Sequence, residues 1–159
     1  MPGSRWFSHV DMEASYPSEP VALEALERVL NAARPGNVDP AGSSAVDGFF
    51  TIAHTADRTA DIYIEVNEDW AALDCMIISQ EFRAGVEPEW IQALALALDQ
   101  VIRGQYVIER TRLKNKIIRT AVSTQGLSRQ TASTCGRLPI PERFLTRERI
   151  ELDYGCHPL

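Results

Sequence analysis

The sequence predicts an α+β fold: an antiparallel sheet of about five or six strands with two helices, in the order α-β-β-β-α-β-β, and one further strand near the end. Two observations lead to this prediction. In two segments hydrophobic residues recur at helical spacing, and in several shorter segments they alternate with polar residues, as in half-buried strands. The chain has 159 residues, of which 45% are hydrophobic and 24% charged, as is typical of a globular protein.

The first helix is expected over residues 19–34. Leu26 and Leu30 belong to an apolar face at helical spacing, and Ser18 is a favourable N-cap. The pair Pro35-Gly36 is expected to end the helix.

The second helix is expected between Pro88 and Gly104. Proline suits the first turn of a helix, and glycine commonly follows the last one. Nearly every position between them is apolar, including Leu94 and Leu98. We therefore expect this helix to be buried, either under the sheet or in an oligomer interface.

Three strands are expected between the helices, at residues 48–55, 61–67 and 71–79. Polar and apolar residues alternate most clearly in the second of them. The preceding residues 37–47 are rich in Gly, Pro, Ser and Asp, which predicts a loop.

Three more strand signals follow the second helix. Residues 106–113 and 116–123 predict a hairpin in which Asn115, in the turn, adopts the left-handed conformation. Residues 148–154 alternate apolar and charged side chains, which predicts an edge strand.

Along the chain we expect four parts. They are a flexible arm over residues 1–17, one α+β domain over 18–123, a mobile linker over 124–137, and a C-terminal segment over 138–159 that contributes the edge strand to the same domain. Trp6, Phe7 and His9 could dock the arm.

Charge is distributed unevenly along the chain. Residues 1–100 have 5 Arg and no Lys against 17 Asp and Glu, a net charge of −12, whereas residues 101–159 have 11 Lys and Arg against 5 Asp and Glu, a net charge of +6. Such asymmetry indicates either an interaction surface of one sign on each half or two halves that neutralise each other in one fold. Because both halves are expected to share one sheet, we favour the second interpretation.

The cysteines indicate a reducing compartment. Cys75, Cys135 and Cys156 are too few for a disulfide framework, and no two have the spacing of a zinc knuckle. The first residues lack the apolar core of a signal peptide, and the longest apolar run, residues 93–98, is far shorter than the roughly 20 residues of a membrane span. We therefore expect a cytoplasmic protein that does not enter a membrane.

One strand offers a candidate for chemistry. The alternation predicts that the side chains of Asp61, Tyr63, Glu65 and Asn67 share an exposed face. Two carboxylates on one face could hold a divalent cation or act as an acid–base pair. An exposed strand face is polar in any case, so we assign no catalytic or metal-binding residue here.

The histidines and glycines give no further site. His54 is in phase with Phe50 and Ile52 and is expected to point inward as a core residue. Cys156-His157 could bind a metal adventitiously, and no glycine-rich phosphate loop is present in the sequence. We therefore predict no cofactor.

The predicted hairpin after the second helix is basic, and Arg103 precedes it. A basic β-ribbon can follow phosphates, but the net acidity of the chain argues against nucleic acid. A protein partner or a subunit contact is the favoured interpretation. The residues expected to bind it are Arg110, Arg112, Lys114, Lys116, Arg119 and, as an aromatic contact, Tyr106.

Over residues 19–123 the element order, the size and the acidity resemble those of the class I type III secretion chaperones and the YbjN-like proteins. The resemblance implies a homodimer that binds an extended segment of a client protein. That family usually closes with a helix after the last strand, and residues from Gln125 onward depart from this pattern. Many bacterial immunity proteins are also small acidic α+β domains without catalytic chemistry.

The leading hypothesis is a non-catalytic protein-binding module that masks or escorts a partner protein. One alternative is a small enzyme with its site on the exposed sheet face. The other is a nucleic-acid binder that uses the basic hairpin at residues 103–119.

Overall fold

The computed structural model describes residues 4–12, 16–75, 78–124, 130–133 and 141–156. It confirms an α+β fold with two helices, but the strands form two sheets rather than one. The chain divides into two compact units: unit 1 is residues 1–103 and 154–159, and unit 2 is residues 104–153. The boundary lies inside residues 18–123, which the sequence predicts to form one domain.

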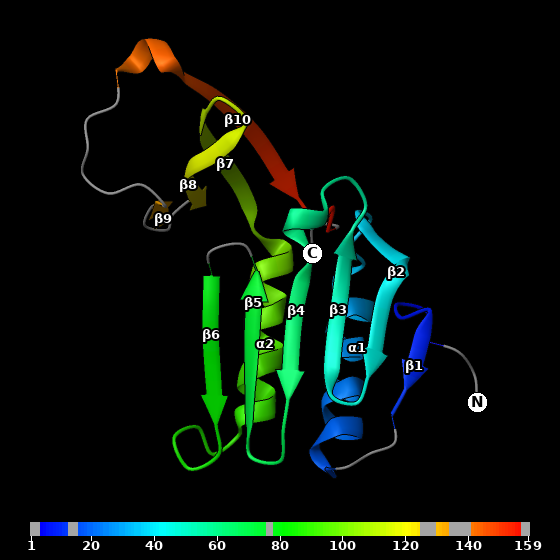
Figure 1. The fold of residues 1–159 in the computed structure, drawn as a ribbon. Coiled ribbons are helices and arrows are strands. Elements are labelled where there is room, and N and C mark those ends of the chain that lie inside the picture. The colour runs from blue at the N-terminus through cyan, green and yellow to red at the C-terminus, as the bar shows by residue number, and fades with distance from the viewer. Residues whose placement is uncertain (1–3, 13–15, 76–77, 125–129, 134–140, 157–159) are drawn as a thin grey trace. The chain divides into compact units, whose positions relative to one another are not determined.

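Unit 1 contains a six-stranded sheet and both helices (Figure 1). Its strands are ordered β1-β2-β3-β4-β5-β6, and all neighbouring pairs are antiparallel except β1 and β2. The elements are β1 (His9–Asp11), α1 (Ser18–Ala33), β2 (Val38–Val46), β3 (Phe49–His54), the 3-10 helix η1 (Arg58–Ala60), β4 (Ile62–Val66), β5 (Trp70–Cys75), β6 (Ile78–Arg83) and α2 (Trp90–Arg103).

The core of unit 1 lies between the sheet and the helices, which pack side by side against one face (Figure 1). Leu26 of α1 and Leu98 of α2 are fully buried, and Leu94 is 1% exposed. In β4 the alternation is as predicted: Ile62 and Ile64 face the helices and Tyr63 faces away. Leu96 of α2 is 60% exposed, so this helix is buried on one face and not all round.

The prediction of a loose N-terminal arm is wrong for its described residues. β1 pairs in parallel with β2, and Trp6 and Phe7 are buried. Trp6 Nε1 donates a hydrogen bond to Asn31 Oδ1 of α1 at 2.7 Å. Two large aromatic side chains therefore fix this segment to unit 1, while His9 stays exposed.

The prediction of a loop over residues 37–47 is also wrong, because β2 occupies most of that range. The pairing of β2 with β3 shifts register between Asp39 and Ser44, and Ser43 Oγ accepts a hydrogen bond from Ala53 N at 2.9 Å. Asp47 and Gly48 form the turn to β3 with φ of 48° and 81°. Two successive positive φ values match the type I′ hairpin turn, for which Asp-Gly is a preferred sequence.

Two smaller predictions in unit 1 need correction. The strand expected over 71–79 is two strands, β5 and β6, which pair as antiparallel neighbours. Ser18 is the first residue of α1 and not its side-chain cap; its Oγ donates to Asn67 O at 2.6 Å, and Pro17 occupies the N-cap position. The helix ends at Ala33, and its C-cap residue, Arg34, has a left-handed conformation.

Unit 2 contains a four-stranded antiparallel sheet in the order β10-β7-β8-β9. The elements are β7 (Gln105–Leu113), β8 (Lys116–Thr124), β9 (Gln130–Ser133), the 3-10 helix η2 (Glu142–Phe144) and β10 (Leu145–Asp153). The predicted hairpin and edge strand are confirmed as β7–β8 and β10. In the hairpin turn Lys114, and not Asn115, has the positive φ, 55°.

The mobile linker predicted over 124–137 lies mostly outside the described residues. Its described part includes β9, a strand that pairs with β8. The remainder of that prediction, residues 125–129 and 134–137, is not described.

After β10 the chain returns to unit 1. Tyr154 is fully buried, and its backbone oxygen accepts a hydrogen bond from Asn37 N at 2.9 Å. Gly155 O accepts one from Gly36 N, and Cys156 Sγ lies 2.9 Å from Ile102 O. Within the described residues, no helix is both long enough and apolar enough to cross a bilayer.

Candidate functional site

The predicted exposed face of the 61–67 strand is only partly correct. Asp61 is 4% exposed and precedes β4 instead of pairing within it. Its Oδ1 accepts a hydrogen bond from His54 N at 2.8 Å, and its Oδ2 lies 3.8 Å from Arg58 Nε. Asp61 therefore has a structural role at the end of η1, and it does not share a solvent-facing site with Glu65.

His54 is a core residue, as expected. It is 4% exposed, and its Nδ1 accepts a hydrogen bond from Ala56 N at 3.1 Å. Its ring packs edge-on against Tyr154, with 5.3 Å between the ring centroids. Because Nδ1 accepts backbone hydrogen bonds from the loop after β3 and the ring packs on Tyr154, this histidine serves packing and loop geometry.

Cys75 lies in the same buried region. Its Sγ is 3.2 Å from Tyr154 Oη, and that hydroxyl donates to Ala60 O at 2.6 Å. Burial raises the pKa of the Cys75 thiol above its ordinary value of about 9, although the Tyr154 hydrogen bond opposes the rise. A buried thiol that stays protonated is a poor nucleophile. Cys135 and His157 lie outside the described residues.

The face of the six-stranded sheet opposite the helices is the first candidate surface (Figure 1). We call it the open face and define it by the outward side chains of Phe49, Thr51, Tyr63, Glu65, Ala72 and Asp74. Phe49 is 58% exposed and Tyr63 is 52% exposed, values that are high for aromatic residues in the middle of a sheet.

The open face has two aromatic–carboxylate pairs. Strand register places Phe49 directly opposite Glu65 and Tyr63 directly opposite Asp74. Side chains of directly opposed residues lie on the same face, with Cβ atoms about 4.5–5.5 Å apart. Each ring therefore stands beside a carboxylate on a neighbouring strand.

The second candidate surface is on the four-stranded sheet. Arg147, Thr111 and Arg119 form one cross-strand row over β10, β7 and β8, which we call the arginine row. Arg149, Glu109 and Ala121 form the next row on the same face. A hollow of about 340 Å³ lies at these two rows.

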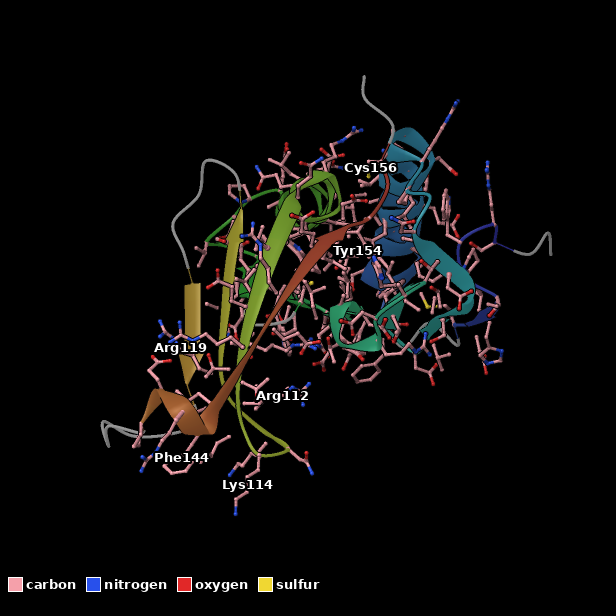
Figure 2. The ribbon with its side chains drawn as sticks, turned by 90° about the horizontal axis from the view of Figure 1, so that it is seen from above. Arg112, Lys114, Arg119, Phe144, Tyr154 and Cys156 are labelled. Carbon is pink, nitrogen blue, oxygen red and sulfur yellow. The ribbon has the colours of Figure 1, made fainter. Side chains whose placement is uncertain are left out.

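The predicted partner-binding residues do not share one face. Strand alternation places Arg110 and Arg112 on the side of Tyr106, opposite the arginine row. Arg112 Nη2 lies 3.5 Å from Glu148 Oε2, and Tyr106 is 4% exposed. Lys114 lies in the hairpin turn and Lys116 is the first residue of β8. Arg119 belongs to the arginine row; Figure 2 labels Lys114 and Arg119.

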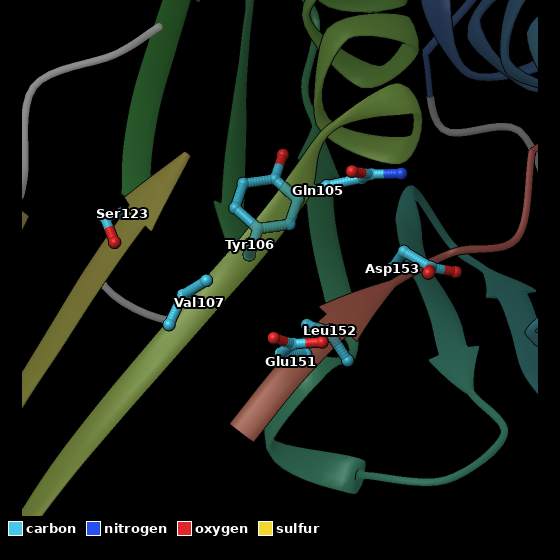
Figure 3. Close-up of a pocket in the computed structure, with 7 residues that line it drawn as sticks. All are labelled: Gln105, Tyr106, Val107, Ser123, Glu151, Leu152 and Asp153. Carbon is cyan, nitrogen blue, oxygen red and sulfur yellow. The ribbon is translucent and has the colours of Figure 1, made fainter. Parts of the chain in front are cut away.

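The same sheet becomes acidic toward its other end. A second hollow, of about 490 Å³, is lined there by Gln105, Tyr106, Val107, Ser123, Glu151, Leu152 and Asp153 (Figure 3). Among the described residues, no group of three His, Cys, Asp or Glu is placed to hold a metal ion.

Sequence reasoning missed Phe49, Asp74, Arg147 and Arg149 as surface residues. Arg147 and Arg149 alternate with Glu148 in β10, which was a signal for a charged strand face but gave no register. Comparison of the chain with protein-family models, curated proteins and solved structures found no match.

Proposed function

We propose that this protein is a non-catalytic protein-binding module whose open face masks a basic, arginine-bearing surface of a partner protein in the cytoplasm, in a chaperone-like or immunity-like role. The observation that supports this most is the pair of exposed rings, Phe49 and Tyr63, each beside a carboxylate. Exposed aromatic residues on a rigid sheet are typical of binding hot spots.

The two pairs suit arginine in particular. A guanidinium can stack on an aromatic ring through a cation–π interaction and at the same time donate hydrogen bonds to a carboxylate. Tyr63 with Asp74, and Phe49 with Glu65, offer this combination twice. The lysine ammonium stacks less well and makes no bidentate contact, so the open face should discriminate between the two cations.

The charge of unit 1 favours the same partner. Unit 1 has 6 Arg and no Lys against 17 Asp and Glu, a net charge of −11. A field of one sign accelerates the encounter with a partner of opposite charge and orients it, while the aromatic contacts determine the lifetime of the complex. Rigid strands present these side chains without a large ordering cost on binding.

The test uses two labelled peptides of equal length, one rich in arginine and one rich in lysine, and measures fluorescence anisotropy with the full chain. The arginine peptide should bind several-fold more tightly. Phe49→Ala with Tyr63→Ala should weaken its binding by about tenfold, because hot-spot aromatic residues are lost. The matched control is Phe144→Ala, which removes an aromatic residue of similar exposure, 52%, from unit 2.

A charge variant separates the electrostatic attraction of the peptide from the stacking of its arginines on the two rings. Asp74→Asn should lower the association rate and its salt dependence, whereas Glu24→Gln on the exposed side of α1 should have less effect. Equal affinity for both peptides, together with no loss in the Phe49 and Tyr63 double variant, would show that the open face is not the binding surface. A pull-down from the native host with mass spectrometry would then identify the partner.

A further inference from the structure

Unit 2 has a charge opposite to that of unit 1. It has 10 Lys and Arg against 5 Asp and Glu, a net charge of +5, and it contains its own sheet. The charge division of the sequence therefore coincides with a structural division. The two halves do not share one sheet, so the interpretation that they neutralise each other within it is not supported.

The cations of this sheet are regularly placed. Arg147 and Arg119 stand on either side of Thr111 in the arginine row, two strand spacings or about 10 Å apart. Arg149 follows Arg147 on the same face of β10, and Lys116 lies opposite Leu113 at the end of the hairpin. These four residues form a track of positive charge over one face of the sheet.

An exposed aromatic ring lies next to the start of β10, the strand that contributes Arg147 and Arg149 to this track. Phe144 directly precedes β10 and is 52% exposed, and the Arg143 guanidinium lies 4.8 Å from its ring centroid (Figure 2). Glu142, in the same turn, accepts a hydrogen bond from Arg147 Nη2 at 2.6 Å. This bond links the turn that contains Phe144 to the arginine row.

We propose that this face of unit 2 binds single-stranded nucleic acid, independently of the partner of the open face. A positively charged track combined with an exposed aromatic side chain is the combination that recognises a single strand: cations contact successive phosphates, and a base stacks on the ring. The arginine row and Lys116 would contact phosphates, and Phe144 would stack a base. An acidic polypeptide offers charge but no base to stack, so Phe144 favours the nucleic acid.

The ion pairs already on this face do not prevent binding. Arg147 and Glu142 are exposed, as are Arg149 and Glu151, whose charged atoms are 3.9 Å apart. Exposed pairs of this kind contribute little, so a phosphate can replace the carboxylate. Glu109 lies between Arg149 and Ala121 and would repel a phosphate there. Glu109→Gln should therefore strengthen binding.

The experiment measures binding of the full chain to a labelled oligothymidine of about 12 nucleotides by anisotropy, across a salt series. Three to four phosphate contacts predict a slope of log K against log salt of about −2 to −3. Arg119→Gln with Arg147→Gln should reduce the magnitude of this slope by about 1.4. Phe144→Ala should weaken binding by roughly tenfold with the slope unchanged, because a stacked base is lost and no charge is removed.

The control is Arg5→Gln with Arg28→Gln, which makes the same change of net charge in unit 1 and should leave the slope as it is. Three results would overturn the proposal: no binding at low salt, an equal slope in the two double variants, or binding of duplex DNA or polyglutamate that is as tight as that of the oligothymidine. None of these depends on the open face, since the arginine peptide and the oligonucleotide have opposite charges. The two proposals can therefore fail separately.

Discussion

Tyr154 provides a direct test of how the last residues of the chain stabilise unit 1. Its hydroxyl donates to Ala60 O at 2.6 Å and lies 3.2 Å from Cys75 Sγ, and the whole side chain is buried. Tyr154→Phe keeps the ring and removes only the hydroxyl. Water cannot enter this closed site to donate to Ala60 O instead, so we expect the free energy of unfolding to fall by about 1–3 kcal/mol.

The effect should be visible by tryptophan fluorescence, because all three tryptophans, Trp6, Trp70 and Trp90, belong to unit 1. For a urea dependence of about 2 kcal/mol per molar, a loss of about 2 kcal/mol lowers the midpoint by about 1 M. Tyr63→Phe is the matched control, since it removes the hydroxyl of a tyrosine that is 52% exposed. Equal midpoints for the two variants would refute the reasoning.

Three further predictions concern the stability of unit 1 and are measured by urea unfolding. Leu94→Ala should cost about 2–5 kcal/mol because Leu94 is 1% exposed, whereas Leu96→Ala should cost less than about 1 kcal/mol; equal costs would contradict the assigned helix face. Gly48→Ala should destabilise more than Gly85→Ala: both have positive φ, but a Cβ at Gly48 would lie 2.5 Å from Val66 O and one at Gly85 meets nothing. The raised pKa of Cys75 means that the unfolded chain loses its thiol proton first, so stability should fall as pH rises above about 9, and Cys75→Ser should reduce that fall.

The elements with clear periodicity could be predicted from the sequence, and the irregular ones could not. The alternation at Ile62, Tyr63 and Ile64 gave the correct strand and the correct faces. β2 was missed because Pro40, Gly42 and Ser43 suggest a loop, although Asp47-Gly48 was a recognisable hairpin signal. The strand forms in spite of its composition because β1 and β3 pair with it on both sides.

The candidate surfaces were harder to predict because they depend on register between strands. Asp61 has the right phase to share a face with Tyr63, but it lies before the first residue of β4 and turns into the protein to accept the His54 amide. The basic residues were recognised by their density, yet only pairing with β10 shows that Arg119 shares a row with Arg147. Sequence spacing contains no information about a partner strand that lies about 30 residues further along the chain.

The chain enters unit 2 at Gly104 and leaves it at Asp153, and at this point Gln105 and Asp153 are paired neighbours on β7 and β10. The chain therefore leaves unit 1 and returns to it, at Tyr154, through two neighbouring strand ends. Unit 2 therefore has the connectivity of an inserted domain: paired residues are only about 5 Å apart, so a few linker residues can reconnect the ends of unit 1. For protein engineering, the same junction is a site at which unit 2 can be exchanged for another domain.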